Sequence, residues 1–164
     1  MYPIGISQLL QAGKIDNVLM AGDYYIGNIE YDNYIDIVLA NAFTRAIQWK
    51  EQPLFSAEFQ GGSIHDKPRL QPTAFDLTTR LCIADGMNGI NYYMFAGGEN
   101  YENIGLFGRR HEWQAPLSSN GDKRPHYFVI QHLGELIKVY EDSLVKTKPV
   151  VDTHIGFYPD YYLT

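Results

Sequence analysis

The sequence lacks the features of several common protein classes. Its 164 residues include one cysteine, Cys82, which cannot form a disulfide within the chain and which we expect to be a packed thiol in an apolar helix. No apolar run is long enough to cross a membrane, and the first residues do not resemble a secretory signal peptide. We therefore expect no membrane partner.

Positive charge is scarce as well. The chain has 13 Lys and Arg residues against 19 Asp and Glu residues, which gives a net charge of -6. Because non-specific nucleic-acid binding requires a basic surface, we expect no nucleic-acid partner. The acidic, cysteine-poor composition favours a cytoplasmic location.

Sequence signatures of metal and nucleotide sites are missing too. The His, Cys, Asp and Glu residues show no metal-ligand spacing, and the glycine pairs at 61–62 and 97–98 match neither the P-loop nor the Rossmann fingerprint. We therefore expect no metal ion and no cofactor. His65 and Asp66 form a pair in a polar loop, where such pairs are more often solvated than catalytic.

Aromatic residues, by contrast, are abundant: the chain has 13 Tyr, 8 Phe and 2 Trp. The hydrophobic fraction of 45% is enough for the core of one domain. Aromatic faces pack well against the apolar C–H surface of a sugar, but they serve equally in ordinary cores. Composition alone leaves both uses open.

Apolar runs bounded by turn residues predict three strands that alternate with helices. The strands are expected at 17–22, 53–59 and 89–95, and the helices at 8–12, 33–47, 74–85 and 126–141. This alternation predicts an α/β fold with a parallel sheet. In the helix expected at 33–47, the apolar spacing predicts a buried stripe with Ile35 and Leu39, and places Asn41 on the other face.

The stretch 53–62, PLFSAEFQGG, carries one carboxylate, Glu58, at the end of a buried strand. Parallel α/β sheets and barrels place their chemistry at the carboxyl ends of the strands. A glutamate between Ala57 and Phe59 is costly to desolvate unless it is paired or used, so Glu58 is a catalytic candidate. The alternative is a partly exposed strand-end glutamate in a structural salt bridge.

Three segments in order resemble glycoside hydrolase family 35, the β-galactosidases. Residues 53–62 resemble the strand of the catalytic nucleophile, 91–101 (NYYMFAGGENY) resemble the family's YMFHGGTNF strand and loop, and 115–121 (APLSSNG) resemble its APLSEDG segment. The resemblance covers about residues 18–140. It implies the last three βα units of a (β/α)8 TIM barrel, a fold that needs about 250 residues as a whole.

The resemblance also implies a division of the chain. We expect residues 1–145 to be the C-terminal part of the glycosidase barrel. Residues 146–164 would then be a linker and the start of a following α/β domain, with a strand at about 150–158. The 96–124 loop is long for a structureless connection, which favours a functional role in the site.

The activity that the resemblance implies is that of a retaining exo-β-glycosidase acting on a carbohydrate substrate. Glu58 takes the nucleophile position, and Tyr24 or Tyr25 is placed to hydrogen-bond it and keep it ionised. A retaining enzyme needs a second carboxyl group about 5 Å away as acid/base. That residue belongs to an earlier strand outside the chain, and Glu30 reads as a loop carboxylate. The isolated chain is therefore expected to be inactive, and a homo-oligomeric parent enzyme stays open.

Further residues are implied to bind substrate, with Phe95 and Trp113 as walls of the sugar site. The implied substrate-binding residues are Asp23, Tyr24, Tyr93, Phe95, Glu99, Asn100 and Trp113.

The sequence departs from the family at positions that shape substrate recognition. Gln60 replaces an aromatic residue, Glu99 replaces a threonine, and 111–117 (HEWQAPL) replaces YDYDAPL. The negative charges of Glu99 and Asp23 would favour a cationic sugar, so an exo-β-D-glucosaminidase is the alternative within the family. A non-catalytic carbohydrate-binding or subunit-interaction module is the alternative from another class.

Overall fold

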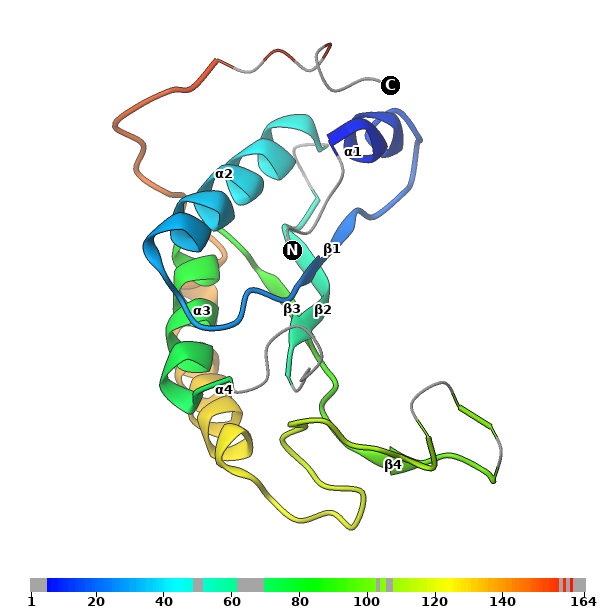
Figure 1. Cartoon of the computed structure of the whole chain (residues 1–164). Coiled ribbons are helices and arrows are strands. Elements are labelled where there is room, and N and C mark those ends of the chain that lie inside the picture. Colours follow the sequence, from blue (N-terminus) through cyan, green and yellow to red (C-terminus); the bar gives the residue numbers. More distant parts are fainter. Residues whose placement is uncertain are drawn as a thin grey trace.

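The computed structural model describes residues 6–48, 52–61, 70–102, 104–105, 108–156, 158 and 160. The His65–Asp66 pair and Gly62 lie outside these residues. In chain order the elements are α1 (Ile6–Ala12), β1 (Ala21–Tyr24), α2 (Tyr31–Ile47), β2 (Phe55–Gln60), α3 (Pro72–Ala84), β3 (Gly89–Tyr93), β4 (Gly98–Glu99), β5 (Arg110–His111) and α4 (Pro125–Leu144) (Figure 1).

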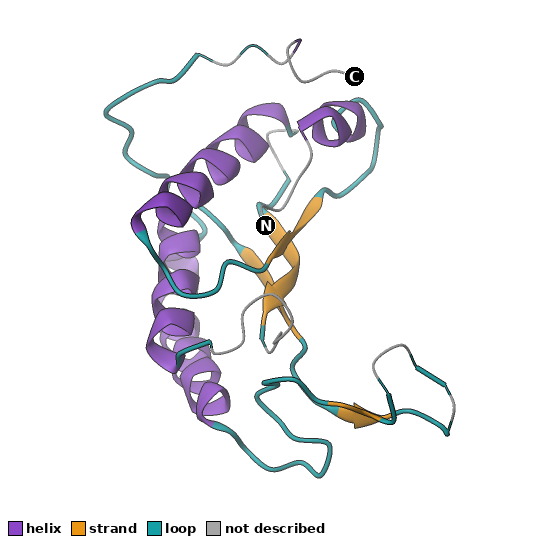
Figure 2. Cartoon of the chain, viewed as in Figure 1, coloured by secondary structure: helices purple, strands orange, loops and turns teal. Residues whose placement is uncertain are grey.

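The first three strands form a parallel sheet in the order β1-β2-β3. The predicted α/β class and its alternation of parallel strands with helices are therefore confirmed. Figure 2 shows α2, α3 and α4 together on one side of this sheet. Strands β4 and β5 form a separate antiparallel pair within the 96–124 loop.

Local sequence explains where the elements begin. Helices α3 and α4 each begin with a proline, Pro72 and Pro125. The first N–H groups of a helix have no acceptor within it, so the N–H that proline lacks is not missed at this position. Strand β1 starts at Ala21, four residues after the predicted start. Asn17 has a positive φ of 61°, so the backbone that precedes β1 is not continuously extended.

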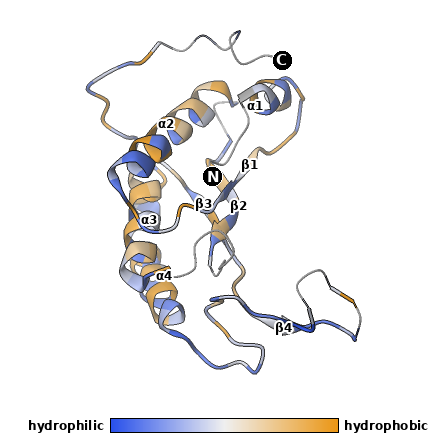
Figure 3. Cartoon of the chain, in the orientation of Figure 1, coloured by the Kyte–Doolittle hydropathy of each residue, from blue (hydrophilic) through white to orange (hydrophobic). Residues whose placement is uncertain are grey.

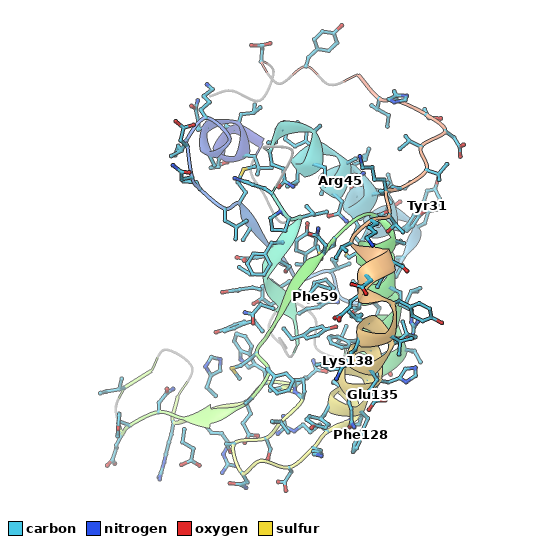
Figure 4. All side chains as sticks on the ribbon, turned by 180° about the vertical axis from the view of Figure 1, so that it is seen from behind. Tyr31, Arg45, Phe59, Phe128, Glu135 and Lys138 are labelled. Atoms are coloured by element: carbon cyan, nitrogen blue, oxygen red, sulfur yellow. The ribbon has the colours of Figure 1, made fainter. Side chains whose placement is uncertain are left out.

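The core lies between the sheet and the helices. Its buried members are Tyr24, Ile26, Ile37, Leu54, Phe59, Cys82 and Met87. Phe59 is fully buried, and its ring centroid lies 6.0 Å from that of Tyr24 and 5.7 Å from that of Tyr92 (Figure 4). The packed Cys82 thiol is confirmed. In Figure 3 the β4 region is largely hydrophilic, whereas the helices carry both polar and apolar positions.

The predicted buried face of α2 is wrong. Asn41 is 0% exposed, whereas Leu39 is 42% exposed. Asn41 tolerates burial because its side-chain oxygen accepts a hydrogen bond of 2.7 Å from the Tyr24 hydroxyl. The helix therefore turns a polar residue with a partner toward the sheet.

The strand expected at about 150–158 is also wrong for the described residues of that range, which adopt no strand. Val150 is 93% exposed and Ile155 is 70% exposed, so neither is packed as a strand in a sheet would be. The segment that follows α4 is drawn as a loop in Figure 1. Within the described residues, no helix combines the length and apolar character that a membrane crossing requires.

Candidate active site

The candidate site lies at the carboxyl ends of the three parallel strands. Glu58 of β2 is the cross-strand partner of Asp23 in β1. On the other side of β2, Gln60 is the partner of Tyr93, the last residue of β3. The parallel register therefore gathers the predicted carboxylates and Tyr93 at one end of the sheet.

A β-bulge in β2 sets the direction of Glu58. From Ser56 to Phe59 strand β2 advances three residues, while its partner β3 advances two, from Ile90 to Tyr92. The register with β1 shifts at the same place. Ser56 and Phe59 are both 0% exposed, whereas Glu58 is half-buried. Because the extra residue resets the alternation of side chains, Phe59 enters the core and Glu58 lies on the opposite face.

Tyr25 is the residue that contacts Glu58. Its hydroxyl donates a hydrogen bond of 2.6 Å to Oε2 of Glu58. Burial, followed by this bond and the negative charge of Glu58, raises the pKa of Tyr25. The phenol therefore stays protonated and remains a donor. Of the two tyrosines that were expected to contact Glu58, Tyr25 is the one that makes the hydrogen bond.

Tyr24 is a correction to the predicted site. Its side chain is 1% exposed and packs on the helix side of the sheet, where its hydroxyl is bonded to Asn41. Successive side chains of a strand point to opposite faces, so Tyr24 and Tyr25 cannot both face Glu58. Tyr24 is a core residue and is not available to a substrate.

Asp23 provides a second carboxylate beside Glu58. Partial loss of solvent raises its pKa, although the residue is exposed, and the negative charge of Glu58 raises it further. Two carboxylates on neighbouring strands favour either a shared proton or a cation close by. One of the two carboxylates can therefore be ionised and act as a nucleophile, while the other binds a proton or a positively charged group.

Gln60 fixes the loop that carries Tyr25. It is 3% exposed, its Oε1 accepts a hydrogen bond of 2.6 Å from the Gly27 N–H, and its Nε2 donates one of 3.2 Å to the Gly27 carbonyl. Gly27 follows Tyr25 by two residues, and Gln60 follows Glu58 by two. The amide therefore ties together the two chain segments whose side chains meet at the Tyr25–Glu58 bond.

Aromatic residues extend the site away from Glu58. The ring of Tyr93 lies 6.5 Å from that of Trp113 at an interplanar angle of 81°, and the His111 ring lies 4.4 Å from Trp113 at 79°. Tyr93 is also the cross-strand partner of Gln60, which follows Glu58 by two residues and lies on the same face of β2. Glu58 and Tyr93, two of the predicted residues, therefore lie on neighbouring strands, and Trp113 is joined to them through the ring of Tyr93.

Phe95 and Glu99, which were also predicted to bind substrate, make other contacts. Phe95 packs against Tyr127 of α4, with ring centroids 6.3 Å apart. Glu99 lies in β4 and pairs with Arg110 at 3.1 Å and with Arg109 at 3.8 Å, which offsets its negative charge.

Asn100 is bound within the same hairpin. Its side-chain amide donates to the Gly108 carbonyl at 2.8 Å. Figure 1 shows the β4 hairpin extending away from the three-stranded sheet.

Two charged residues beside Trp113 were not predicted. Glu112 pairs with Arg124 at 2.6 Å. Hydrogen bonds from the side chain and backbone N–H of Ser119, and then Arg124, lower the pKa of Glu112 to about 2. The length of the 96–124 loop was the one signal in the sequence that pointed to this region. Glu30 precedes α2 as its N-cap, which agrees with the interpretation of Glu30 as a loop carboxylate.

The described part of the chain holds no group of three or more His, Cys, Asp or Glu residues that could bind a metal ion. The arrangement instead offers a carboxylate with a fixed tyrosine donor, a second carboxylate and an aromatic flank. It is suited to nucleophilic chemistry on a polar ligand with apolar faces.

Comparison with known proteins gives relatives in carbohydrate chemistry, although no protein-family model matches the chain. The chain is 26% identical over 148 residues to a β-1,2-glucosyltransferase of Ignavibacterium album, a match that covers 90% of this chain and 20% of that protein. It is 32% identical over 113 residues to an exo-β-D-glucosaminidase of Thermococcus kodakarensis, a match that covers 66% of this chain and 14% of that protein.

A solved structure is similar as well. It is a β-galactosidase from the Antarctic haloarchaeon Halorubrum lacusprofundi, with a TM-score of 0.48 and 15% identity, and the match covers 82% of this chain and 18% of that one. The chain spans no more than 20% of the length of these two curated relatives. Their names relate the chain to carbohydrate-active enzymes of the β-glycosidase type.

Proposed function

We propose that these residues are part of the catalytic (β/α)8 barrel of a retaining exo-β-glycosidase similar to glycoside hydrolase family 35. Glu58 is its nucleophile, and the acid/base residue lies elsewhere in a longer protein, called the parent enzyme below. The observation that carries this proposal is Glu58 near the carboxyl end of β2, with the Tyr25 hydroxyl 2.6 Å from its carboxylate. The carbohydrate-active relatives support the same reaction class.

The reaction follows from a carboxylate held beside a protonated tyrosine. An oxygen of Glu58 attacks C1 of a terminal β-linked sugar and forms a glycosyl ester. The C1–O bond to the leaving group breaks, and the acid residue protonates the departing oxygen. Water then attacks C1 and gives its proton to the same residue, now a base. The ester breaks, Glu58 returns as a carboxylate, and the sugar keeps its β configuration.

Two observations bear on the substrate. Asp23 beside Glu58 favours a sugar with a positive charge, which supports a β-glucosaminide as the alternative to a β-galactoside. Glu99 gives no such support, because Arg109 and Arg110 offset its charge. Transfer of the glycosyl group to a sugar hydroxyl instead of water would follow from the same ester intermediate, and one relative is named a glucosyltransferase.

The decisive experiment traps the ester in the parent enzyme. Fluorogenic 2-deoxy-2-fluoro glycosides of galactose and glucose are incubated with it, and the labelled peptide is mapped by mass spectrometry. We expect the label on Glu58, and we expect Glu58→Gln to lose both labelling and turnover of a β-glucosaminide. A label on another residue, or full turnover by Glu58→Gln, would overturn the assignment. Sugar binding without labelling or turnover would favour the non-catalytic module.

A further inference from the structure

We propose that Glu112 and Arg124 are positioning residues that hold Trp113 as an aromatic wall against the apolar face of the bound sugar. This inference rests on the proposed function for its ligand. Its structural part, the clamp on Trp113, can be measured without any activity. Four observations carry it: a strained backbone, an ion pair around it, a neighbour that leaves room for the ion pair, and a link to Glu58.

Trp113 has a backbone conformation that a bulky residue avoids. Its φ is 44°, in the left-handed region. Such conformations are unfavourable for a bulky side chain and persist only where the surroundings determine them, most often at functional sites and ligand clamps. The loop therefore contains interactions that hold this residue against its local preference.

Glu112 supplies the first half of these interactions. It immediately precedes Trp113, and its side chain is 15% exposed. One carboxylate oxygen accepts hydrogen bonds from the backbone N–H of Ser119, at 2.8 Å, and from the Ser119 hydroxyl. The other pairs with Arg124 at 2.6 Å. Glu112 thus joins the segment before Trp113 to the two segments that follow it.

Arg124 supplies the second half. Besides Glu112, its guanidinium donates to the carbonyl of Trp113 itself, at 3.2 Å, and to the carbonyl of Ala115, at 3.3 Å. One planar, multidentate cation therefore contacts residues on both sides of Trp113 and the peptide of Trp113. Lysine offers a single point charge and cannot make this set of bonds.

The chain around the ion pair is shaped to admit it. A Cβ at Gly97 would lie 2.7 Å from Cγ of Glu112, so the strand-end loop can pass this closely only with a glycine there. Gly97 is four residues after Tyr93, whose ring lies 6.5 Å from that of Trp113 and which pairs across the sheet with Gln60, two residues after Glu58. The clamp is thus built directly onto the end of β3 that forms the candidate site.

The test compares Glu112→Gln and Arg124→Lys in the parent enzyme with a matched control, Asp76→Asn. The control also converts a carboxylate that pairs with an arginine, because Asp76 bonds Arg80 at 2.9 Å on the outside of α3. We expect each clamp variant to raise KM by about 3- to 10-fold and to change kcat by less than about twofold, because a wall binds the sugar in ground state and transition state alike. Asp76→Asn should change neither parameter.

A second readout follows the indole directly. In a Trp49→Phe background Trp113 is the remaining tryptophan of the 164 residues, and acrylamide quenching of a tryptophan reports its accessibility. Parent-enzyme tryptophans outside these residues are replaced in the same background. We expect the clamp variants to increase quenching of Trp113, and the double variant to do no more than the stronger single one, since the two residues act as a unit.

The outcomes separate this inference from the proposed function. Unchanged quenching and unchanged KM would overturn the clamp, and increased quenching with unchanged KM would overturn the sugar wall. Turnover by Glu58→Gln would instead contradict the proposed nucleophile and leave the quenching result standing. If Glu112→Gln does not unfold cooperatively, Ser119→Ala removes one bond to the same carboxylate and gives the same comparison.

Discussion

The bond between Tyr25 and Glu58 joins the residue that follows β1 to strand β2 at the centre of the candidate site. At 2.6 Å it is a charge-assisted hydrogen bond, which is stronger than one between neutral groups. Because the pKa of Tyr25 is raised, the proton stays on the phenol. Glu58 therefore faces a permanent donor, which can stabilise its negative charge whenever the carboxylate is free.

Removing this donor should slow the step in which Glu58 departs as a carboxylate. For Tyr25→Phe we expect reactivation of the 2-fluoro glycosyl ester to slow by about 10- to 100-fold, the equivalent of a charged hydrogen bond of about 1.5–3 kcal/mol. Tyr24→Phe is the control, because that hydroxyl is bonded to Asn41 in the core. It should lower thermal stability and leave the reactivation rate as it is. Equal rates for Tyr25→Phe and the wild type would contradict the role of Tyr25.

Asp23 gives a prediction on pH. Its pKa is raised in the folded protein, so the ionised form opposes folding at pH values above the folded pKa, and this penalty disappears as the pH falls below the unfolded value of about 3.9. Asp23→Asn should therefore raise the melting temperature slightly at pH 7 and by less at pH 3.5. The gain is small because water screens an exposed carboxylate. Thermal unfolding at both pH values checks it, and a larger gain at the acidic pH would contradict it.

Single residues were predictable only where local sequence carries the signal. Glu58 stood out because it interrupts an apolar strand. Tyr25 could not be separated from Tyr24, because alternation assigns faces only once one buried residue of β1 is known, and Tyr24 is held in the core by Asn41 of a different element. Glu112 and Arg124 are twelve residues apart in a loop without periodicity, so no pattern in the sequence relates them.

At the scale of elements, the bulge in β2 determines which face of the sheet Glu58 occupies. Regular alternation from the buried Ser56 would send Glu58 toward the helices and Phe59 to the open face. The bulge reverses both directions, and the register shift with β1 and β3 marks its position. Bulges occur often next to active sites for this reason. Neither Ala57 nor Phe59 is a residue type that indicates a bulge, so the sequence predicted a regular strand and the bulge was not foreseen.

Gln60 provides the link between β2 and the loop after β1, and it can be tested as such. In Gln60→Glu the new carboxylate cannot donate to the Gly27 carbonyl, and a buried charge is left without a cation. We expect a loss of about 3 kcal/mol or more in the free energy of unfolding, measured by urea denaturation of the parent enzyme. Gln131→Glu on the exposed surface of α4 is the matched control and should change little. A stable Gln60→Glu variant would show that the link is dispensable.

Elements themselves were predicted better than their faces. The three strands and the long helices were found because apolar runs and proline positions are local signals. The buried face of α2 was not, because Asn41 is accommodated by Tyr24, a partner from another element that apolar spacing cannot reveal. The strand at about 150–158 failed for a different reason: the apolar side chains of Val150, Val151 and Ile155 predicted burial, but each is at least 55% exposed.

At the scale of the whole molecule, the described sheet is open. Strands β1 and β3 are its outer strands, and each pairs on one side within the described residues. All three long helices cover the same face (Figure 2). Parallel sheets are normally covered on both faces, and unpaired edges invite further strands. These features agree with the proposed place of the chain in a larger barrel.

The isolated 164-residue chain should therefore neither hydrolyse glycosides nor stay monomeric. We expect self-association that increases with concentration in sedimentation velocity experiments, because open edges and uncovered apolar residues drive pairing. Activity should be absent, since the proposed acid/base residue lies outside the chain. A folded monomer that turns over a β-glycoside would contradict both expectations and would return Glu30 to consideration as the acid/base.

The left-handed backbone of Trp113 has a consequence for selection and engineering. A glycine at position 113 would adopt the same φ of 44° without the steric cost of a side chain. Trp113→Gly would relieve that cost, about 1–3 kcal/mol, but would lose the ring contacts with Tyr93 and His111, about 0.5–1.5 kcal/mol each, and would add entropy to the unfolded chain. The melting temperature should therefore change little or fall, while sugar affinity weakens. A screen for thermal tolerance alone would not report the loss of this binding surface, so binding has to be selected for directly.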